Sequence, residues 1–241
     1  MIHASKYLTF IAVCLAFCFY SGDAFAASGG PVELVGDTIE YDSAQGIMTA
    51  QGNVRLTQDG AVMTGTNAQY DTKNKEALIT GGVHYTKEDL SLTAFQVRSY
   101  QDTHLVADGD AVLTKGANTL QGPQIEYYSD RQYALVNGAG RLEMPDATMT
   151  ANRLEAYLGE DKGVGTGNVH IVGTTRNLDA VSEQAVYYGI KGEVPGKIVL
   201  TGSPRVVQDG NVLTGNTMTI YLDEKSMDAQ GRSKLIVKPQ Q

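Results

Sequence analysis

The stretch Gly52–Asp71, GNVRLTQDGAVMTGTNAQYD, decides how this chain folds. It returns near the C-terminus as Gly202–Asp223, GSPRVVQDGNVLTGNTMTIYLD, and both copies share the core QDG-x-V-[ML]-T-G. Weaker copies lie between them. Tyrosines spaced 28 to 34 residues apart mark the seven units: Tyr41, Tyr70, Tyr100, Tyr128, Tyr157, Tyr187 and Tyr221. Such a period predicts an array of one repeated supersecondary unit.

Side chains within the repeat alternate with period 2, the pattern of a β-strand with one buried face. Met48, Val54 and Leu56 share one parity, and Thr49 and Arg55 share the other. A glycine opens each return strand on the apolar parity, where the missing side chain lets a strand bend. No helical period is present, so we expect an all-β chain.

Two kinds of turn join the predicted strands. Asp59-Gly60 and Asp209-Gly210 are hairpin signals, and polar clusters such as residues 71–75 form turns at the opposite end. Seven units of two strands predict about 14–16 antiparallel strands, mostly sequential neighbours. A sheet with one apolar face must fold over on itself, which predicts an elongated, twisted jellyroll with an apolar seam.

The apolar parity also predicts which residues line this seam. They either fill a closed core or form a partly open groove that holds an elongated apolar ligand, and both interpretations stay open. Tyr70, Tyr127 and Tyr128 either rim the seam or plug the turns. The residues expected to line the seam are Met48, Val54, Leu56, Met63, Ile79, Val83, Leu92, Leu105, Leu113, Leu120, Ile125, Leu142, Met149, Leu154, Ile171 and Met218.

Residues 1–26 have the features of a secretory signal. Lys6 supplies a positive charge, an apolar run follows it, and Ala-Phe-Ala at 24–26 favours cleavage before Ala27. The run is shorter than the roughly 20 residues of a bilayer span, although an uncleaved anchor stays an alternative. Residues 27–241 then form a single domain, and because both cysteines lie in the signal, this domain has no disulfide and no thiolate site.

Charge and motif content argue against several function classes. The net charge of −8 is unsuited to nucleic-acid phosphates. No Gly-x-Ser-x-Gly or His-Glu-x-x-His stretch occurs. His84 and His170 fall on the outward parity, and His104 falls in a predicted turn. We therefore expect no enzyme activity, no catalytic residue, no metal and no cofactor.

The repeat resembles that of the OstA-like family. The resemblance rests on the N-terminal signal, a period near 29, the pattern V-x-L…[ML]-x-[GA]-x-x-A-x-Y-D at Val54–Asp71 and the opening glycines, and it covers residues 32–237. Because the motif is degenerate, its repetition carries the specificity. The resemblance implies a V-shaped β-jellyroll in the periplasm of Gram-negative cells. It also implies that the protein passes lipid A acyl chains of lipopolysaccharide along an apolar groove, from inner to outer membrane, for outer-membrane assembly.

The same resemblance implies partners, namely an inner-membrane-anchored protein C and the outer-membrane translocon of lipopolysaccharide transport, with energy supplied by an inner-membrane ATPase. Two features depart from the family. The connector Gly189–Gly196 is long, and the acidic surface gives no support for binding a phosphorylated head group. The rival interpretation is a repeat-built structural or adhesive cell-envelope protein with a closed, dry core.

The two ends of the predicted sheet suggest self-association. An open sheet leaves unpaired backbone groups at both edges, here expected at Val32–Tyr41 and Lys234–Val237. Lys234, Lys238 and Pro239 are typical guards against edge pairing, and a protected monomer is the alternative. We predict head-to-tail association, a heterologous contact that gives open chains.

Overall fold

The computed structural model describes residues 30–173, 177–190, 192, 194–224 and 226–238, so the predicted signal, residues 1–26, lies outside the described part. The described residues form eighteen β-strands in one antiparallel sheet. Within these ranges no helix combines the length and hydrophobicity of a bilayer span. The all-β prediction is confirmed.

The strands differ in length along the chain. The long central strands are β3 (Ile47–Gln58), β4 (Ala61–Asp71), β5 (Glu76–Lys87), β6 (Leu90–Tyr100), β7 (His104–Lys115), β8 (Asn118–Tyr128), β9 (Tyr133–Glu143), β10 (Ala147–Tyr157), β11 (Lys162–Gly173) and β12 (Leu178–Tyr188). The short terminal strands are β1 (Glu33–Val35), β2 (Thr38–Asp42), β13 (Lys197–Thr201), β14 (Arg205–Gln208), β15 (Asn211–Thr214), β16 (Thr217–Tyr221), β17 (Met227–Gln230) and β18 (Lys234–Ile236).

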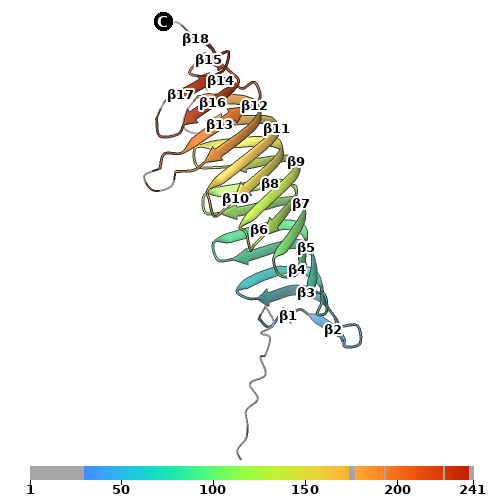
Figure 1. Cartoon of the computed structure of the whole chain (residues 1–241). Helices are drawn as coiled ribbons and strands as arrows, with labels where there is room; N and C mark the ends of the chain where they lie inside the picture. The colour runs from blue at the N-terminus through green and yellow to red at the C-terminus, as the bar shows by residue number, and fades with distance from the viewer. Residues whose placement is uncertain (1–29, 174–176, 191, 193, 225, 239–241) are drawn as a thin grey trace, which may run out of the picture.

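Each long strand bends at its middle and so runs through two walls of a V. One run of the chain through both walls is called a pass. Near the ends of the molecule the bend interrupts the strand, so one pass consists of two short strands. These pairs are β1 with β2, β13 with β14, β15 with β16, and β17 with β18. Ten long strands and four interrupted pairs make fourteen bent passes, in agreement with two strands per unit. Figure 1 shows these passes stacked along the long axis of the molecule.

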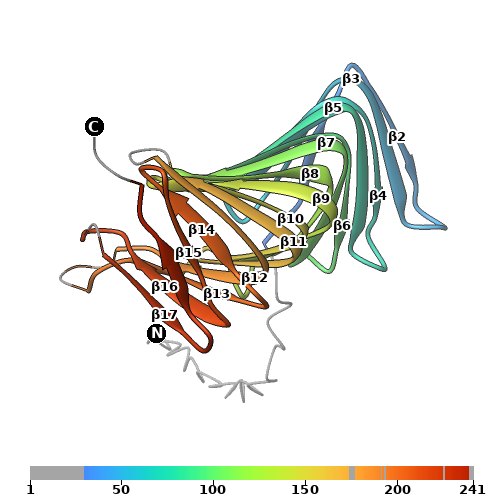
Figure 2. The same ribbon diagram turned by 90° about the horizontal axis from the view of Figure 1, so that it is seen from above.

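The V has two walls and an open side, the mouth. The first wall contains β2, β13, β16 and β17 together with the half of each long strand that pairs in line with them. The second wall contains β1, β14, β15 and β18 together with the other half of each long strand. The mouth is the open side of the V, where the turns of the two walls face each other. Figure 2 shows the walls diverging from the bend and the twist that accumulates from β2 to β17.

A two-residue bulge lies at the bend of every second pass. Gly52 and Asn53 have φ of 71° and 47°, and the β3–β4 register jumps between Gln51 and Val54. Two residues of β3 therefore lie opposite one residue of β4, which kinks the strand. Positive φ recurs at the opening glycine of every unit: Gly52, Gly81, Gly109, Gly138, Gly167, Gly202 and Gly231.

The opening glycines do not lie on the apolar face, so that expectation is wrong. A Cβ added to Gly109 would lie 2.7 Å from Cβ of Phe95, and one added to Gly167 would lie 2.9 Å from Nδ2 of Asn152. Phe95 and Asn152 occupy the bend of the preceding pass on the outside of the V. The bulge rotates the glycine away from the interior, and close stacking of successive bends leaves no room for a side chain.

The predicted hairpin turns are present. Asp59 and Gly60 both have positive φ between β3 and β4, as do Asp209 and Gly210 between β14 and β15. Two central residues with positive φ are the signature of a type I′ turn, whose twist matches that of the flanking strands.

Both ends of the stack are free edges among the described strands. β1 and β2 pair only with β3, while β17 pairs only with β16 and β18 only with β15. The predicted first edge, Val32–Tyr41, coincides with β1 and β2. The predicted last edge, Lys234–Val237, coincides with β18 but omits β17, because the bend at Gly231 divides the last pass between the two walls.

Candidate functional site

The sixteen side chains expected along the seam all belong to the apolar interior of the V. Fifteen of them are buried, and Met48 is half-buried against the same core. The parity that the sequence predicts therefore places these residues correctly. In the structure they pack against one another.

Cross-strand register arranges the interior side chains in rows along the stack. The second-wall row runs unbroken through Leu34, Leu56, Met63, Tyr85, Leu92, Leu113, Leu120, Leu142, Met149, Ile171, Ala180, Val206, Leu213 and Leu235. The facing row of the first wall includes many small residues, among them Ala50, Ala68, Ala107, Gly165, Ala185 and Ala229. Small residues on one wall leave space for the large residues of the other, which is how close-packed cores interdigitate.

The interior is closed at the centre, and none of the residues that the structure describes caps it at either end. Leu113 and Met149 have no exposed surface. At the first edge, by contrast, Ile39 and Tyr41 of the interior rows are 47% and 60% exposed, and at the last edge Leu235 is 61% exposed. Both edges therefore expose apolar surface that the described strands do not cover.

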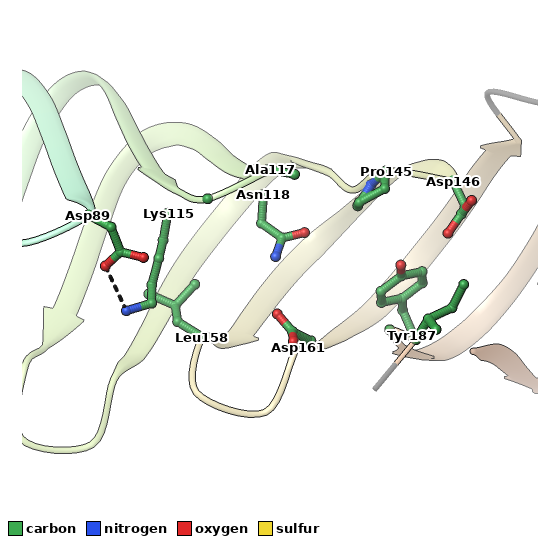
Figure 3. Close-up of a pocket in the computed structure, with 12 residues that line it drawn as sticks. Asp89, Lys115, Ala117, Asn118, Pro145, Asp146, Leu158, Asp161 and Tyr187 are labelled. Atoms are coloured by element: carbon green, nitrogen blue, oxygen red, sulfur yellow. Dashed lines mark hydrogen bonds and ion pairs between the residues drawn. The ribbon is translucent and has the colours of Figure 1, made fainter. Parts of the chain in front are cut away.

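The mouth is hollowed in more than one place along the stack. A cavity of about 290 Å³ lies between the Gly116–Asn118 and Pro145–Asp146 turns of the second wall and Leu158, Asp161 and Ile190 of the first (Figure 3). A smaller cavity of about 60 Å³ lies between Gln58–Asp59 and Asp102. The connector that the sequence marks as unusually long thus borders the mouth through its Ile190.

The rim of the larger cavity is acidic. Asp89, Asp146 and Asp161 contribute carboxylates, and Lys115 lies 3.1 Å from Asp89 in an ion pair (Figure 3). The net negative charge of this rim disfavours an anion placed directly on it.

The tyrosines that mark the units divide between the two faces of the sheet. Tyr41, Tyr70 and Tyr187 face the interior, and the others face outward: Tyr100, Tyr128, Tyr157 and Tyr221. Tyr127, which precedes Tyr128, also faces the interior. Tyr128 does not rim the seam, because the side chains of neighbouring strand residues point to opposite faces. Arg131 of the following turn lies over its ring, with Cζ 4.3 Å from the ring centroid, and the alternative that Tyr128 plugs the turn stays a prediction.

An aromatic row crosses the outer surface of the first wall. Rings of Tyr100, His104, Tyr128, Tyr133 and Tyr157 follow one another at centroid distances of 4.3 to 5.9 Å. His104 therefore begins β7 rather than lying in a turn, because the preceding turn is only three residues long. Its ring is parallel to that of Tyr128 and contributes to cross-strand packing.

A carboxylate supports this outer row. Glu155 accepts hydrogen bonds from Tyr133 (2.7 Å), Tyr157 (3.3 Å) and Arg153 (3.1 Å). Burial alone would raise the pKa of Glu155, but the hydrogen bonds from Tyr133 and Arg153, together with the Arg153 charge, outweigh burial and lower it. This arrangement is part of the wall and lies away from the interior.

The histidines form no shared centre in the described part of the chain. His84 is exposed on β5, and His170 lies 2.9 Å from Asp179 on the outer surface. No cluster of three or more metal-ligating side chains occurs among the described residues.

No protein family matches this sequence, and no curated protein matches it. Among solved structures, the chain is similar to LptH of Pseudomonas aeruginosa, described as the LptA-homologous periplasmic component of the conserved lipopolysaccharide transport device. The sequences are 21% identical and the TM-score is 0.41. The similar region covers 43% of this chain and 80% of LptH.

Proposed function

We propose that this protein is a periplasmic carrier of lipopolysaccharide that holds lipid A acyl chains between its two walls and passes them toward the outer membrane. The observation that supports the proposal best is the apolar interior, which runs from one uncapped edge to the other. The resemblance of the repeat to the OstA-like family, stated above from the sequence, supports the choice of lipid.

The energetics of the interior suit acyl chains. Burial of each methylene group contributes about 0.8 kcal/mol, so an apolar interior holds a multi-acylated lipid without charged ligands. Because Leu113 and Met149 are fully buried, acyl chains must separate the walls and take over the contacts that the two rows make with each other. The mouth is the side where this separation needs no strand pairing to break.

The free edges suit a chain of copies between two membranes. β18 and β1 both belong to the second wall, and β17 and β2 both belong to the first. Pairing the last pass of one copy with the first pass of the next therefore continues both walls, and the exposed Leu235 meets the row that begins at Leu34. Related edges of an inner-membrane-anchored protein C and of the outer-membrane translocon are the proposed terminal partners.

Site-specific photo-crosslinking tests the proposal. Crosslinkers are placed at three inward positions and, as matched controls, at three outward positions: Leu56, Leu92 and Leu120, and Arg55, Gln121 and Asp179. In cells that make lipopolysaccharide, the inward set captures it and the outward set does not. Equal labelling of both sets refutes an interior lipid site.

The packed centre of the interior favours the rival candidate, a structural or adhesive envelope protein whose core stays dry. Both candidates share the walls and the edges, but they differ in what the purified protein carries. Extraction with organic solvent followed by lipid analysis yields stoichiometric lipid for a carrier and none for a dry structural protein.

A further inference from the structure

Four buried tyrosines lie next to the mouth, inside the V. Tyr70, Tyr127 and Tyr187 are each the second-to-last residue of their strands, and Tyr85 is the third-to-last of β5. Their exposed fractions are only 3% to 6%. Tyr70 and Tyr85 border the smaller cavity, and Tyr187 borders the larger one.

None of these four hydroxyl groups has a hydrogen-bond partner among the described residues. The four hydroxyl oxygens are not among the fully enclosed polar atoms that lack a partner, so they reach solvent at the mouth, whereas the outward Tyr128 and Tyr133 donate to glutamates. Figure 3 shows the hydroxyl of Tyr187 directed into the cavity, toward Pro145 and Asp146. The inward hydroxyls thus have a free hydrogen-bonding capacity at the boundary between the apolar interior and the polar rim.

The surroundings keep these hydroxyls neutral. Burial raises the pKa of Tyr85 and Tyr187 to about 12, with the charges near Tyr187, from Asp146 and Asp161, adding to the effect. Burial, followed by nearby acidic side chains, also raises the pKa of Tyr70 and Tyr127. Each group is therefore a proton donor across the physiological range.

We propose that Tyr70, Tyr85, Tyr127 and Tyr187 form a row of donors that binds the ester and amide carbonyl groups at the heads of acyl chains held in the interior. This inference rests on the proposed function and adds the polar half of the same site. It fixes the direction of the lipid, with the chain ends toward the bend and the head group at the mouth.

The acidic rim decides between a carbonyl group and a phosphate group as acceptor. A phosphate next to Asp146 and Asp161 is repelled, whereas an uncharged carbonyl oxygen is not. Carbonyl groups also occur where hydrocarbon ends, which is the depth at which the hydroxyls lie. The phosphates of the head group then extend beyond the rim into solvent.

Adjacent tyrosines on opposite faces supply the variants for the test. The inward triple variant is Tyr85→Phe, Tyr127→Phe and Tyr187→Phe, and the outward double variant is Tyr128→Phe and Tyr188→Phe. Each change removes one hydroxyl and keeps the ring. Binding of fluorescent lipopolysaccharide is measured by titration, and circular dichroism confirms that each variant keeps its β-sheet spectrum.

The expected result is weaker binding of lipopolysaccharide to the inward triple variant only. One hydrogen bond corresponds to about two- to tenfold in affinity, so the triple variant loses at least about tenfold, and the outward variant binds as the wild type does. Binding of an apolar dye without carbonyl groups is unchanged in both variants, since the dye makes no use of the hydroxyls.

Infrared spectroscopy of the wild-type protein provides a second measurement that does not depend on a variant folding. The carbonyl stretching band of bound lipopolysaccharide, isotope-labelled in its acyl carbonyl groups, shifts to lower wavenumber when a hydroxyl donates to it. Two results would overturn this inference and leave the proposed function standing. In the first, the wild type binds lipopolysaccharide but the carbonyl band does not shift. In the second, the inward triple variant binds lipopolysaccharide as tightly as the wild type does. Failure of the wild type to bind lipopolysaccharide overturns both.

Discussion

At the scale of single residues, the bend of every second pass depends on two neighbouring positions with different steric demands. The first position is glycine in every unit, whereas the second is occupied by Asn53, Gly82, Asp110, Ala139, Asn168, Ser203 and Arg232 in turn. Both positions have positive φ at six of these seven bends, all except that at Ala139, so backbone conformation alone does not explain the difference. A Cβ at the first position meets the bend of the preceding pass, while one at Gly82 meets nothing within 4 Å.

The adjacent glycines of β5 separate these two effects. Gly81→Ala introduces a residue with unfavourable positive φ and a collision with Thr66, and we expect a loss of about 2–4 kcal/mol in the free energy of unfolding. Gly82→Ala introduces the positive-φ cost alone, about 1 kcal/mol. Urea unfolding monitored by circular dichroism measures both losses, and equal losses would contradict the steric account.

The inward tyrosines give stability a dependence on alkaline pH. The pKa of Tyr85 and of Tyr187 is about 12 in the folded protein, against roughly 10 in an unfolded chain. Because the folded-state pKa is the higher one, the stabilisation is complete below about pH 10 and is lost as pH rises toward about 12.

Replacing either tyrosine by phenylalanine removes this loss. At about pH 11.5, Tyr85→Phe and Tyr187→Phe are each expected to be about 2 kcal/mol more stable relative to wild type than they are at about pH 9. Urea unfolding at the two pH values measures the change. A difference between variant and wild type that is the same at both would show that these hydroxyls ionise equally readily in the folded and unfolded protein.

At the scale of elements, the bent strand allows one sheet to supply both walls of its own core. Each long strand contributes inward side chains to both walls. The bulge of β3 keeps one parity inward on either side of the bend, at Ala50 and Val54, whereas β4 has no bulge and its inward parity changes at the bend, from Met63 to Ala68. Every wall is therefore held by strand pairing along the stack, while the two walls face each other across the interior through side chains alone. Side-chain contacts separate more easily than a hydrogen-bonded ladder, so we expect any separation of the walls to begin at the mouth.

A reversible link across the mouth tests this motion. Asn118 and Asp161 face each other across the larger cavity (Figure 3). Residues 27–241 contain no natural cysteine, so cysteines introduced at these two positions are the only ones in this part of the chain. A short cleavable thiol crosslinker between Asn118→Cys and Asp161→Cys is expected to reduce uptake of fluorescent lipopolysaccharide at least about tenfold, and reduction of the link restores it.

The matched control joins two strands of one wall. Thr114 and Thr119 pair across β7 and β8, with their hydroxyl oxygens 3.4 Å apart. A crosslink between Thr114→Cys and Thr119→Cys stays within one wall and does not cross the mouth, so we expect uptake of lipopolysaccharide to be unchanged. Undiminished uptake by the cross-mouth linked protein would show that lipid reaches the interior through the edges instead.

At the scale of the whole molecule, an even number of passes makes the two edges complementary. The first pass runs from the second wall to the first, and the fourteenth runs from the first to the second. The last pass of one copy and the first pass of the next are therefore antiparallel when stacked, as all neighbouring passes are. A head-to-tail contact of this kind does not close on itself and extends into open chains.

Removal of β18 tests the contact between copies. Deleting Ser233–Gln241 removes the second-wall arm of the last edge, and we expect it to abolish concentration-dependent oligomers while the β-sheet circular dichroism spectrum stays nearly unchanged. A chain that ends at Val237 keeps β18 and serves as the control. Analytical ultracentrifugation over a concentration series measures both, and persistence of the same oligomers without β18 would rule out this edge.

The sequence by itself determined the local structure of this protein. Period-2 alternation identified the strands and the inward residues from Met48 to Met218, and the Asp-Gly pairs identified the hairpins. These features depend on neighbours along the chain, because side-chain direction and turn type are set within a few residues. The repetition of the unit then indicated one continuous sheet.

Only the tertiary structure decided what depends on register between strands. A shift of one residue moves a side chain to the opposite face, so the regular spacing of the tyrosines did not reveal that Tyr187 faces the interior while Tyr157 faces outward. The opening positions must be glycine because a side chain there would collide with the preceding pass. The last edge includes β17 as well as β18 because the chain bends at Gly231. The mouth, with the four inward tyrosines beside it, exists only because the bend brings the ends of both walls to face each other.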